Sequence, residues 1–285
     1  MILSSSHPFG GAPSVTCGTP SVPPRGRSVG LFVLLVSLGL WLPPARAAAQ
    51  VPGVRVPFTA GERLFYRAQS SRFGRVGTGE MWVEGPTALR GTNVFVLRMR
   101  VRAGLGPFTG TDESTSWLDP VRFATLRFDK VEKHLSSRFR ETVDVFPDEW
   151  RWRAVGAPLA EGPTAAAAPL DELSFIYFLR TVEVDTVGTV AYDRHYDAAR
   201  RPTTIRFLGR DTVTVAAGRF ASIVLEMRVL DARRYQGVGT LTLHLTDDAC
   251  RVPVRIESQM PVFGTTVLQL DARPAHAPPL APCDR

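Results

Sequence analysis

The strongest constraint on the fold is an alternation of apolar and polar residues that recurs along most of the chain. In the segment 95–102, apolar Phe, Leu, Met and Val at the odd positions alternate with Val or Arg at the even ones. The segments 241–246 and 252–257 alternate in the same way. Because successive side chains of a β-strand point to opposite faces, this pattern predicts strands with one buried face and one polar face.

Turn residues separate roughly a dozen such segments, at the short and even spacing typical of an antiparallel sandwich or barrel. Gly85-Pro86, Asp119-Pro120 and Ala217-Gly218 are examples. Glycine supplies the positive φ of tight hairpins, and proline interrupts a strand ladder. The predicted strands are 62–70, 76–84, 95–102, 109–118, 121–129, 134–146, 149–154, 188–196, 203–208, 211–216, 221–230, 241–246, 252–257 and 262–271. The predicted fold class is therefore all-β and mainly antiparallel, a curved sheet, open barrel or sandwich with one helix packed on it.

The segment of about residues 170–181 breaks this alternation and predicts that helix. It begins with acidic residues and ends at Arg180, which suits the helix dipole. Its apolar residues lie nearly all round the helical wheel, as in a helix packed into a sheet or filling a barrel mouth. A buried strand is the alternative. The Gly/Pro/Ala-rich stretch 161–169 before it reads as a linker, and without an internal repeat we expect a single β-rich domain over residues 61–271.

Residues 1–49 predict a secretory signal peptide with an extended leader. Arg25 and Arg27 precede the apolar stretch Val29 to Leu42, and an Ala-rich segment with cleavage sites after Ala47 or Ala49 follows. The apolar stretch is shorter than the ~20 residues of a membrane-spanning helix. We expect an exported protein, periplasmic or extracellular, with no membrane span after cleavage. An uncleaved anchor is the alternative. Residues 50–60 read as a linker and 272–285 as a Pro/Ala-rich tail.

Two cysteines, Cys250 and Cys283, remain after removal of the leader. An oxidising compartment permits a disulfide between them, which would pin the tail 272–285. Two unpaired thiols are the alternative. Without a CxxC motif, neither thioredoxin chemistry nor a cysteine zinc site is predicted.

The basic character of the chain does not predict nucleic-acid binding. The formal net charge is +7, and of 34 basic residues only Lys130 and Lys133 are lysines. The arginines are dispersed along the chain, whereas a nucleic-acid footprint gathers basic residues in one run or on one face.

No catalytic or metal-binding constellation is predicted, and no cofactor. The chain has neither an HExxH nor a GxSxG motif. His244 precedes Asp247 and Asp248 at a spacing that suits a metal, but we interpret it as a solvated strand histidine followed by turn acids. His195 lies in a polar strand end and is expected at the surface.

Aromatic residues on strands and on the helix suggest a ligand cavity. Core packing accounts for most of them. The more specific interpretation is an apolar cavity inside the curved sheet, with the helix as its lid and Tyr66, Trp82, Trp117 and Tyr177 as lining. Barrels of about eight strands can enclose one small ligand.

Three stretches of the chain resemble a known bacterial family. They are Gly61–Tyr66 with Phe73–Glu80, the helical segment Leu173–Arg180, and Val213–Phe220 followed by 245–248 and 251–256. In order and spacing they are similar to the domain of unknown function 3108 family, over about Gly61 to Leu270. The resemblance implies an exported, β-rich envelope protein of uncharacterised activity and supplies no catalytic residues. The long leader and the cysteine pair are not part of the family pattern.

Together these features favour a non-enzymatic periplasmic protein that binds an apolar, lipid-like or amphipathic envelope component or assists envelope assembly. One alternative is a hydrolase of envelope polymers that uses carboxylates among Asp112, Glu113, Glu141 and Glu257. The other is a structural protein that docks an envelope partner through an exposed sheet edge.

Overall fold

In the computed structural model, the residues described below belong to one compact unit within residues 46–285. The residues that the structure describes are 56–106, 108–134, 137–156, 160–183, 188–231, 237–260 and 264–272. The predicted signal peptide and most of the predicted tail lie outside these ranges.

The described residues form one sheet of 14 strands and one α-helix. The strands are β1 (Arg63–Ser70), β2 (Gly74–Leu89), β3 (Thr92–Leu105), β4 (Phe108–Asp119), β5 (Ala124–His134), β6 (Ser137–Phe146), β7 (Arg151–Ala154), β8 (Glu161–Pro163), β9 (Thr189–Tyr192), β10 (Thr203–Val215), β11 (Gly218–Asp231), β12 (Gly237–Thr246), β13 (Pro253–Met260) and β14 (Gly264–Leu270). The α-helix α1 spans Glu172–Leu179, and two 3₁₀ turns cover Pro147–Glu149 and Ala198–Arg200. The predicted all-β class with one helix is confirmed.

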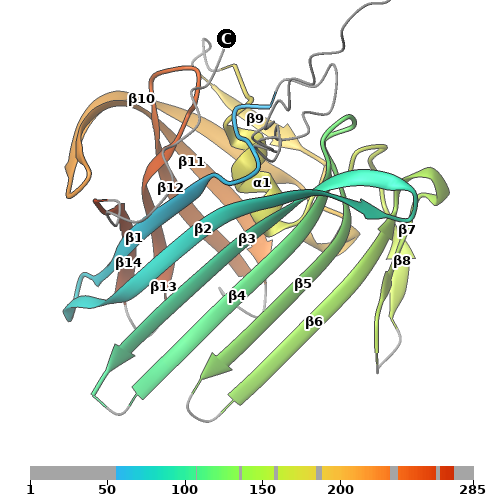
Figure 1. The fold of residues 1–285 in the computed structure, drawn as a ribbon, viewed down its shortest axis with the longest axis horizontal. Coiled ribbons are helices and arrows are strands. Elements are labelled where there is room, and N and C mark those ends of the chain that lie inside the picture. Colours follow the sequence, from blue (N-terminus) through green and yellow to red (C-terminus); the bar gives the residue numbers. More distant parts are fainter. Residues whose placement is uncertain are drawn as a thin grey trace, which may run out of the picture. The chain divides into compact units, whose positions relative to one another are not determined.

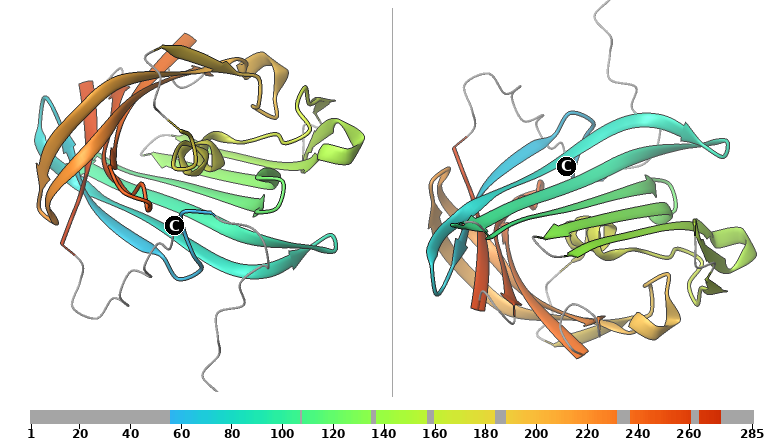
Figure 2. Two further views of the ribbon diagram at one scale, coloured as in Figure 1. Left: turned by 90° about the horizontal axis from the view of Figure 1, so that it is seen from above. Right: turned by 90° about the horizontal axis from the view of Figure 1, so that it is seen from below.

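The sheet is an antiparallel meander whose two chain-terminal strands pair with each other (Figure 1). Every other neighbour in the sheet is also the neighbour in sequence. The pairing of β1 with β14 therefore moves the open edges to β8 and β9, the two strands that flank α1 in the chain. Figure 2 shows the sheet curling around this helix. The helical segment thus enters the concave side of the sheet where the strand ladder is interrupted.

Several local features differ from the predicted strand pattern. Gly85-Pro86, predicted as a turn, lies inside β2, where the register against β3 shifts between Glu84 and Thr87. The predicted strand 188–196 is shorter in the structure, as β9. The segments 203–208 and 211–216 form the single strand β10, because a register shift between Phe207 and Gly209 keeps both halves paired with β11. Gly209 takes a φ of +133° there, which only glycine adopts without strain. The stretch read as a linker contains the short strand β8.

The core lies between the concave face of the sheet and α1. Alternate residues of the longer strands supply it, as Leu64, Tyr66 and Ala68 do on β1. The helix is buried nearly all round, as its sequence predicts, with Phe175 and Tyr177 among the most buried side chains of the described region. The apolar side chains of the strands are buried against α1, and this burial determines which face of each strand points inward.

The start of α1 is attached to β4 and β5 through its N-cap, Asp171. One carboxylate oxygen of Asp171 accepts hydrogen bonds from the backbone N–H groups of Leu173 and Ser174, at 2.8 and 2.9 Å. The other oxygen accepts from the hydroxyls of Ser116 on β4 and Thr125 on β5, at 2.5 and 2.7 Å. A single buried carboxylate therefore caps the helix and positions it against the sheet.

The end of α1 is attached to the start of β1 by a buried ion pair. The Arg180 guanidinium donates to both carboxylate oxygens of Glu62, at 2.6 and 2.9 Å, and to the carbonyl oxygen of Cys250 at 2.9 and 3.1 Å. Arg180 side-chain exposure is 0%, and that of Glu62 is 7%. The helix is therefore held at both ends inside the curved sheet, and the space beside it is defined by fixed walls.

Candidate functional site

A cavity of about 400 Å³ lies between α1 and the concave face of the sheet. One wall is apolar and comes from β2, β3, β11, β12, β13, β14 and the helix. Its residues are Val76, Met99, Val101, Ala103, Leu173, Phe175, Ile176, Met227, Val229, Leu230, Leu241, Ile256 and Leu268. The volume falls in the range of pockets that hold one small ligand.

A second wall of the same cavity is polar and charged. Asp112 and Ser114 on β4, Lys130 and His134 on β5, Glu172 at the start of α1, and His195 and Arg200 from the segment after β9 supply it. The cavity is therefore amphipathic, with an extended apolar surface and a localised group of ionisable side chains.

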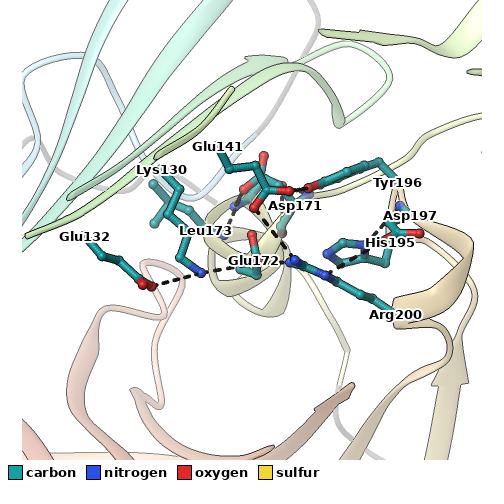
Figure 3. A network of polar contacts seen from close by, with 11 residues as sticks. Lys130, Glu132, Glu141, Asp171, Glu172, Leu173, His195, Tyr196, Asp197 and Arg200 are labelled. Atoms are coloured by element: carbon teal, nitrogen blue, oxygen red, sulfur yellow. Dashed lines mark hydrogen bonds and ion pairs between the residues drawn. The ribbon is translucent and has the colours of Figure 1, made fainter. Parts of the chain in front are cut away.

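Glu172 is the centre of the charged wall (Figure 3). Its Oε1 accepts a short hydrogen bond from Nη1 of Arg200 and lies 3.6 Å from Nζ of Lys130. Burial by itself raises the pKa of Glu172, but the positive charges of Lys130 and Arg200 outweigh burial and hold the pKa at about 2. Glu172 is therefore ionised at any physiological pH.

Glu141, on the inner face of β6, shares Arg200 with Glu172. Its Oε2 lies 3.7 Å from Nη2 of Arg200, and its Oε1 accepts a hydrogen bond from the Tyr196 hydroxyl at 3.1 Å. Burial and the neighbouring charge of Glu172 raise the pKa of Glu141. The two carboxylates thus differ in acidity because Glu172 contacts both Lys130 and Arg200, whereas Glu141 contacts only Arg200 of these two cations.

His195 adds a neutral donor to the charged wall. Its side chain is 4% exposed, which corrects the surface position expected from the sequence. Burial lowers its pKa to about 4, in spite of the nearby Glu172 carboxylate. Its Nδ1 accepts a hydrogen bond from the backbone N–H of Asp197 at 3.1 Å, so the proton of the neutral ring lies on Nε2. Nε2 has no hydrogen-bond partner among the described residues.

The four aromatic residues predicted to line a cavity lie elsewhere. Tyr66 and Tyr177 are fully buried in the core, and the Tyr66 hydroxyl donates to the Pro253 carbonyl oxygen at 2.9 Å. Trp82 and Trp117 project from the convex face of the sheet. There Arg63 and Arg100 cover Trp82, and Arg127 lies over Trp117, at 5.4 to 5.9 Å from the ring centroids. None of the four is among the residues of the cavity walls.

The four carboxylates considered for hydrolysis are divided between the two faces of the sheet. Asp112 and Glu141 point inward, whereas Glu113 and Glu257 lie on the convex face. Glu113 pairs with Arg100 at 2.8 Å, and Glu257 with Arg255 at 2.6 Å. The structure therefore does not bring all four together.

Other predicted features lie at the margins of the described region. Cys250 is in the turn between β12 and β13, but Cys283 lies outside the described residues, so the disulfide stays a prediction. Within the described ranges, no group of three or more His, Cys, Asp or Glu side chains is arranged to hold a metal ion. No helix in that part of the chain is long and apolar enough to span a membrane.

The charged wall was missed by sequence reasoning, although one signal for it exists. Lys130 follows the buried Leu126 and Phe128 on β5 at two-residue spacing. The alternation itself therefore places this lysine on the inner face of the sheet. Arg200 and His195 offer no comparable signal, because the segment after β9 has no strand periodicity.

These features define a class of β-rich, barrel-like proteins in which one continuous antiparallel sheet encloses a helix and an amphipathic cavity. Within it, the chain belongs to the family described as protein of unknown function (DUF3108), whose model matches residues 64–271. The sequence resemblance is thereby confirmed. No relative was found among curated proteins.

One solved structure supports the fold. The chain is similar to a β-barrel-like protein of domain of unknown function DUF1849 from Brucella abortus, with a TM-score of 0.50 and 10% identity over 77% of this chain and 98% of that one. A candidate lipoprotein from Parabacteroides distasonis matches the same shares of the two chains at 10% identity, with a TM-score of 0.29. At this identity the first likeness concerns the fold alone, and the second is too distant to support an argument.

Proposed function

We propose that the protein is exported to the cell envelope and there binds one small amphiphilic molecule in the cavity beside α1. The observation that carries this proposal is the division of the cavity into an apolar wall and a charged wall. An apolar chain would lie against Met99, Val101 and Met227, and a polar head would lie near Glu172.

The energetics of the cavity favour a ligand with an apolar part. Protein interiors are normally close-packed, and side chains that line a void lose dispersion contacts. Transfer of an alkyl chain from water to this wall gains about 25 cal/mol per Å² of buried apolar surface. A ligand with an apolar part therefore gains free energy from a space that the protein's own side chains leave unfilled.

Binding is favoured over hydrolysis because the inner carboxylates already have protein partners. Asp112 lies 2.8 Å from Nε2 of His134, and Glu141 contacts Arg200 and Tyr196. The charged groups form a compensated network, which suits recognition of a polar head.

Export is supported by the signal pattern of residues 25–50. Expression of the full chain in a bacterial host, followed by cell fractionation and intact-mass analysis, tests it. The expected product lies in the periplasmic or extracellular fraction and begins after Ala47 or Ala49. Recovery of the uncleaved chain from the cytosol would contradict export without affecting the cavity.

The cavity is tested with the purified protein and the apolar fluorophore N-phenylnaphthylamine. Ala103 lies in the apolar wall, and Ala103→Phe places a ring in the cavity. Ala88 on β2 is exposed, so Ala88→Phe is the matched control. We expect Ala103→Phe to weaken fluorophore binding by at least about tenfold, while Ala88→Phe binds like the unmodified protein.

A second filling variant, Val229→Phe, reaches the cavity from β11 and serves if Ala103→Phe does not fold. Circular dichroism verifies folding. Unchanged fluorophore binding by a folded filling variant would refute the cavity as the site. Native mass spectrometry of the exported protein then shows whether it carries a bound lipid-like molecule.

A further inference from the structure

The charged wall retains hydrogen-bonding groups that the protein does not use. The Nε2–H of His195 is a donor and Oε2 of Glu172 an acceptor, and neither has a hydrogen-bond partner among the described residues. Lys130 Nζ lies 3.6 Å from Glu172 and 3.7 Å from Glu132, both longer than a hydrogen bond. All three residues line the cavity.

One wall of the cavity therefore contains two donor residues, His195 and Lys130, and one acceptor residue, Glu172. A buried polar atom without a partner costs free energy, and a ligand atom that supplies the partner recovers it. A head group that both accepts and donates hydrogen bonds satisfies His195, Lys130 and Glu172 together. A carboxylate or a phosphodiester anion can only accept, and an ammonium can only donate.

The charge balance of the wall disfavours an anionic head. Lys130 lies between the carboxylates of Glu132 and Glu172. Arg200 contacts Glu172, Glu141 and Asp197. Both cations are therefore already matched by carboxylates, and among the described residues of this wall neither Lys130 nor Arg200 has an uncompensated charge to offset the desolvation of an entering anion.

The same ion pairs disfavour a cationic head. An ammonium near Glu172 would compete with Lys130 and Arg200 for that carboxylate, at the distances where like charges repel. It would also leave the Nε2–H of His195 without an acceptor.

From these contacts we infer that the cavity selects amphiphiles with an uncharged, hydroxyl-bearing head group, such as a monoacylglycerol, over anionic or cationic amphiphiles of the same chain length. The inference rests on the proposed binding function and adds the ligand class. His195 and Lys130 donate to the hydroxyl oxygens of the head, and a hydroxyl donates to Oε2 of Glu172.

The test compares three amphiphiles with the same number of chain carbons, monolauroylglycerol, dodecanoate and dodecylamine, as competitors of N-phenylnaphthylamine below their micelle-forming concentrations. We expect monolauroylglycerol to displace the fluorophore at a concentration about tenfold lower than the other two, the ratio given by roughly one well-formed hydrogen bond to a charged group. Equal or stronger displacement by dodecanoate or dodecylamine would overturn the inference. If the fluorophore itself does not bind, the proposed function fails instead.

Two variants link the selectivity to the charged wall. His195→Phe is expected to reduce the preference for monolauroylglycerol to about threefold or less, measured as the ratio of the concentrations of the amphiphiles that displace the fluorophore from this variant. His244→Phe is the matched control, because His244 lies on β12 among the convex-face residues Arg255 and Glu257 and is not part of the cavity. If both histidine variants keep the full preference, the assignment of the head group to His195 is wrong.

Glu172→Gln provides an independent measurement if His195→Phe does not fold. It removes one negative charge and leaves Lys130 and Arg200 less compensated. We expect dodecanoate to gain about tenfold in this variant relative to monolauroylglycerol. An unchanged ratio would contradict the role of charge balance in selecting the head group.

Discussion

The burial of His195 makes a quantitative prediction about stability and pH. In the folded protein the pKa of this histidine is about 4, whereas its ordinary value is 6.5, because burial disfavours the imidazolium. Between these values the unfolded chain binds a proton that the folded protein does not bind. The free energy of unfolding therefore falls as the pH falls from about 6.5 to about 4.

The size of the effect follows from the two pKa values. A difference between 6.5 and about 4 corresponds to about 3 kcal/mol in full, since each pKa unit is worth about 1.4 kcal/mol. About 2 to 3 kcal/mol of this is lost between about pH 7 and about pH 4.5. For a protein of ordinary stability, that is a large part of the total.

His195→Gln isolates this contribution. Glutamine does not titrate, and its side-chain oxygen can accept the hydrogen bond that Nδ1 accepts from the Asp197 N–H. Urea unfolding of both proteins at about pH 7 and about pH 4.5 gives four free energies of unfolding. Other titrating groups contribute to both proteins, so they largely cancel in the difference.

The expected result is that the stability of the histidine protein relative to the Gln variant decreases by about 2 to 3 kcal/mol on acidification. A difference that stays constant with pH would show that His195 titrates normally in the folded protein. The buried, neutral donor on which the head-group inference depends would then be absent.

Two further predictions concern the ends of α1. Burial raises the pKa of Asp171 to about 6 from an ordinary 3.8, against the hydrogen bonds from Ser116 and Thr125 that lower it. Because the folded state binds this proton more tightly than the unfolded chain does, the contribution of Asp171 to stability is lost as the pH rises from about 4 to about 6, by up to about 3 kcal/mol. In urea unfolding across the same pH range, Asp171→Asn should remove that loss. An unchanged dependence of stability on pH in this variant would contradict the raised pKa of Asp171. Arg180→Met should lower the free energy of unfolding by about 3 to 5 kcal/mol, since it leaves Glu62 buried without its partner, and adding Glu62→Gln should recover part of the loss in thermal unfolding. Equal destabilisation by the single and double variants would show that the pair does not act as a unit.

Much of the fold was predictable because strand alternation is a local property. Because successive side chains of a strand point to opposite faces, Asp112 and Glu113 must lie on opposite faces of β4, and the structure places them so. The helix was predictable from the break in that alternation, and its N-cap forms a capping box that is local in sequence. The family was predictable from short motifs in a fixed order, which the match over residues 64–271 confirms.

The position of aromatic residues was not predictable in the same way. Trp82 lies between Met81 and Val83, so all three positions are apolar and the pattern does not tell which face is buried. The structure turns Met81 and Val83 inward and leaves Trp82 under arginines on the convex face. Alternation determines that neighbours face opposite ways, but only packing against α1 decides which way is inward.

By itself, then, the sequence determined the strands, the single helix and the relative orientation of neighbouring side chains, because these depend on residues a few positions apart. The tertiary structure alone decided that β1 pairs with β14, that the sheet stays open at β8 and β9, and that Lys130, Glu172, His195 and Arg200 meet in one cavity. Lys130 lies on β5 and Glu172 on α1, while His195 and Arg200 lie in the segment after β9. Only the curvature of the whole sheet brings these elements together. The physical reason is that contacts between distant residues form where apolar side chains are buried and buried charges are paired in the same arrangement. A local sequence pattern does not contain that information.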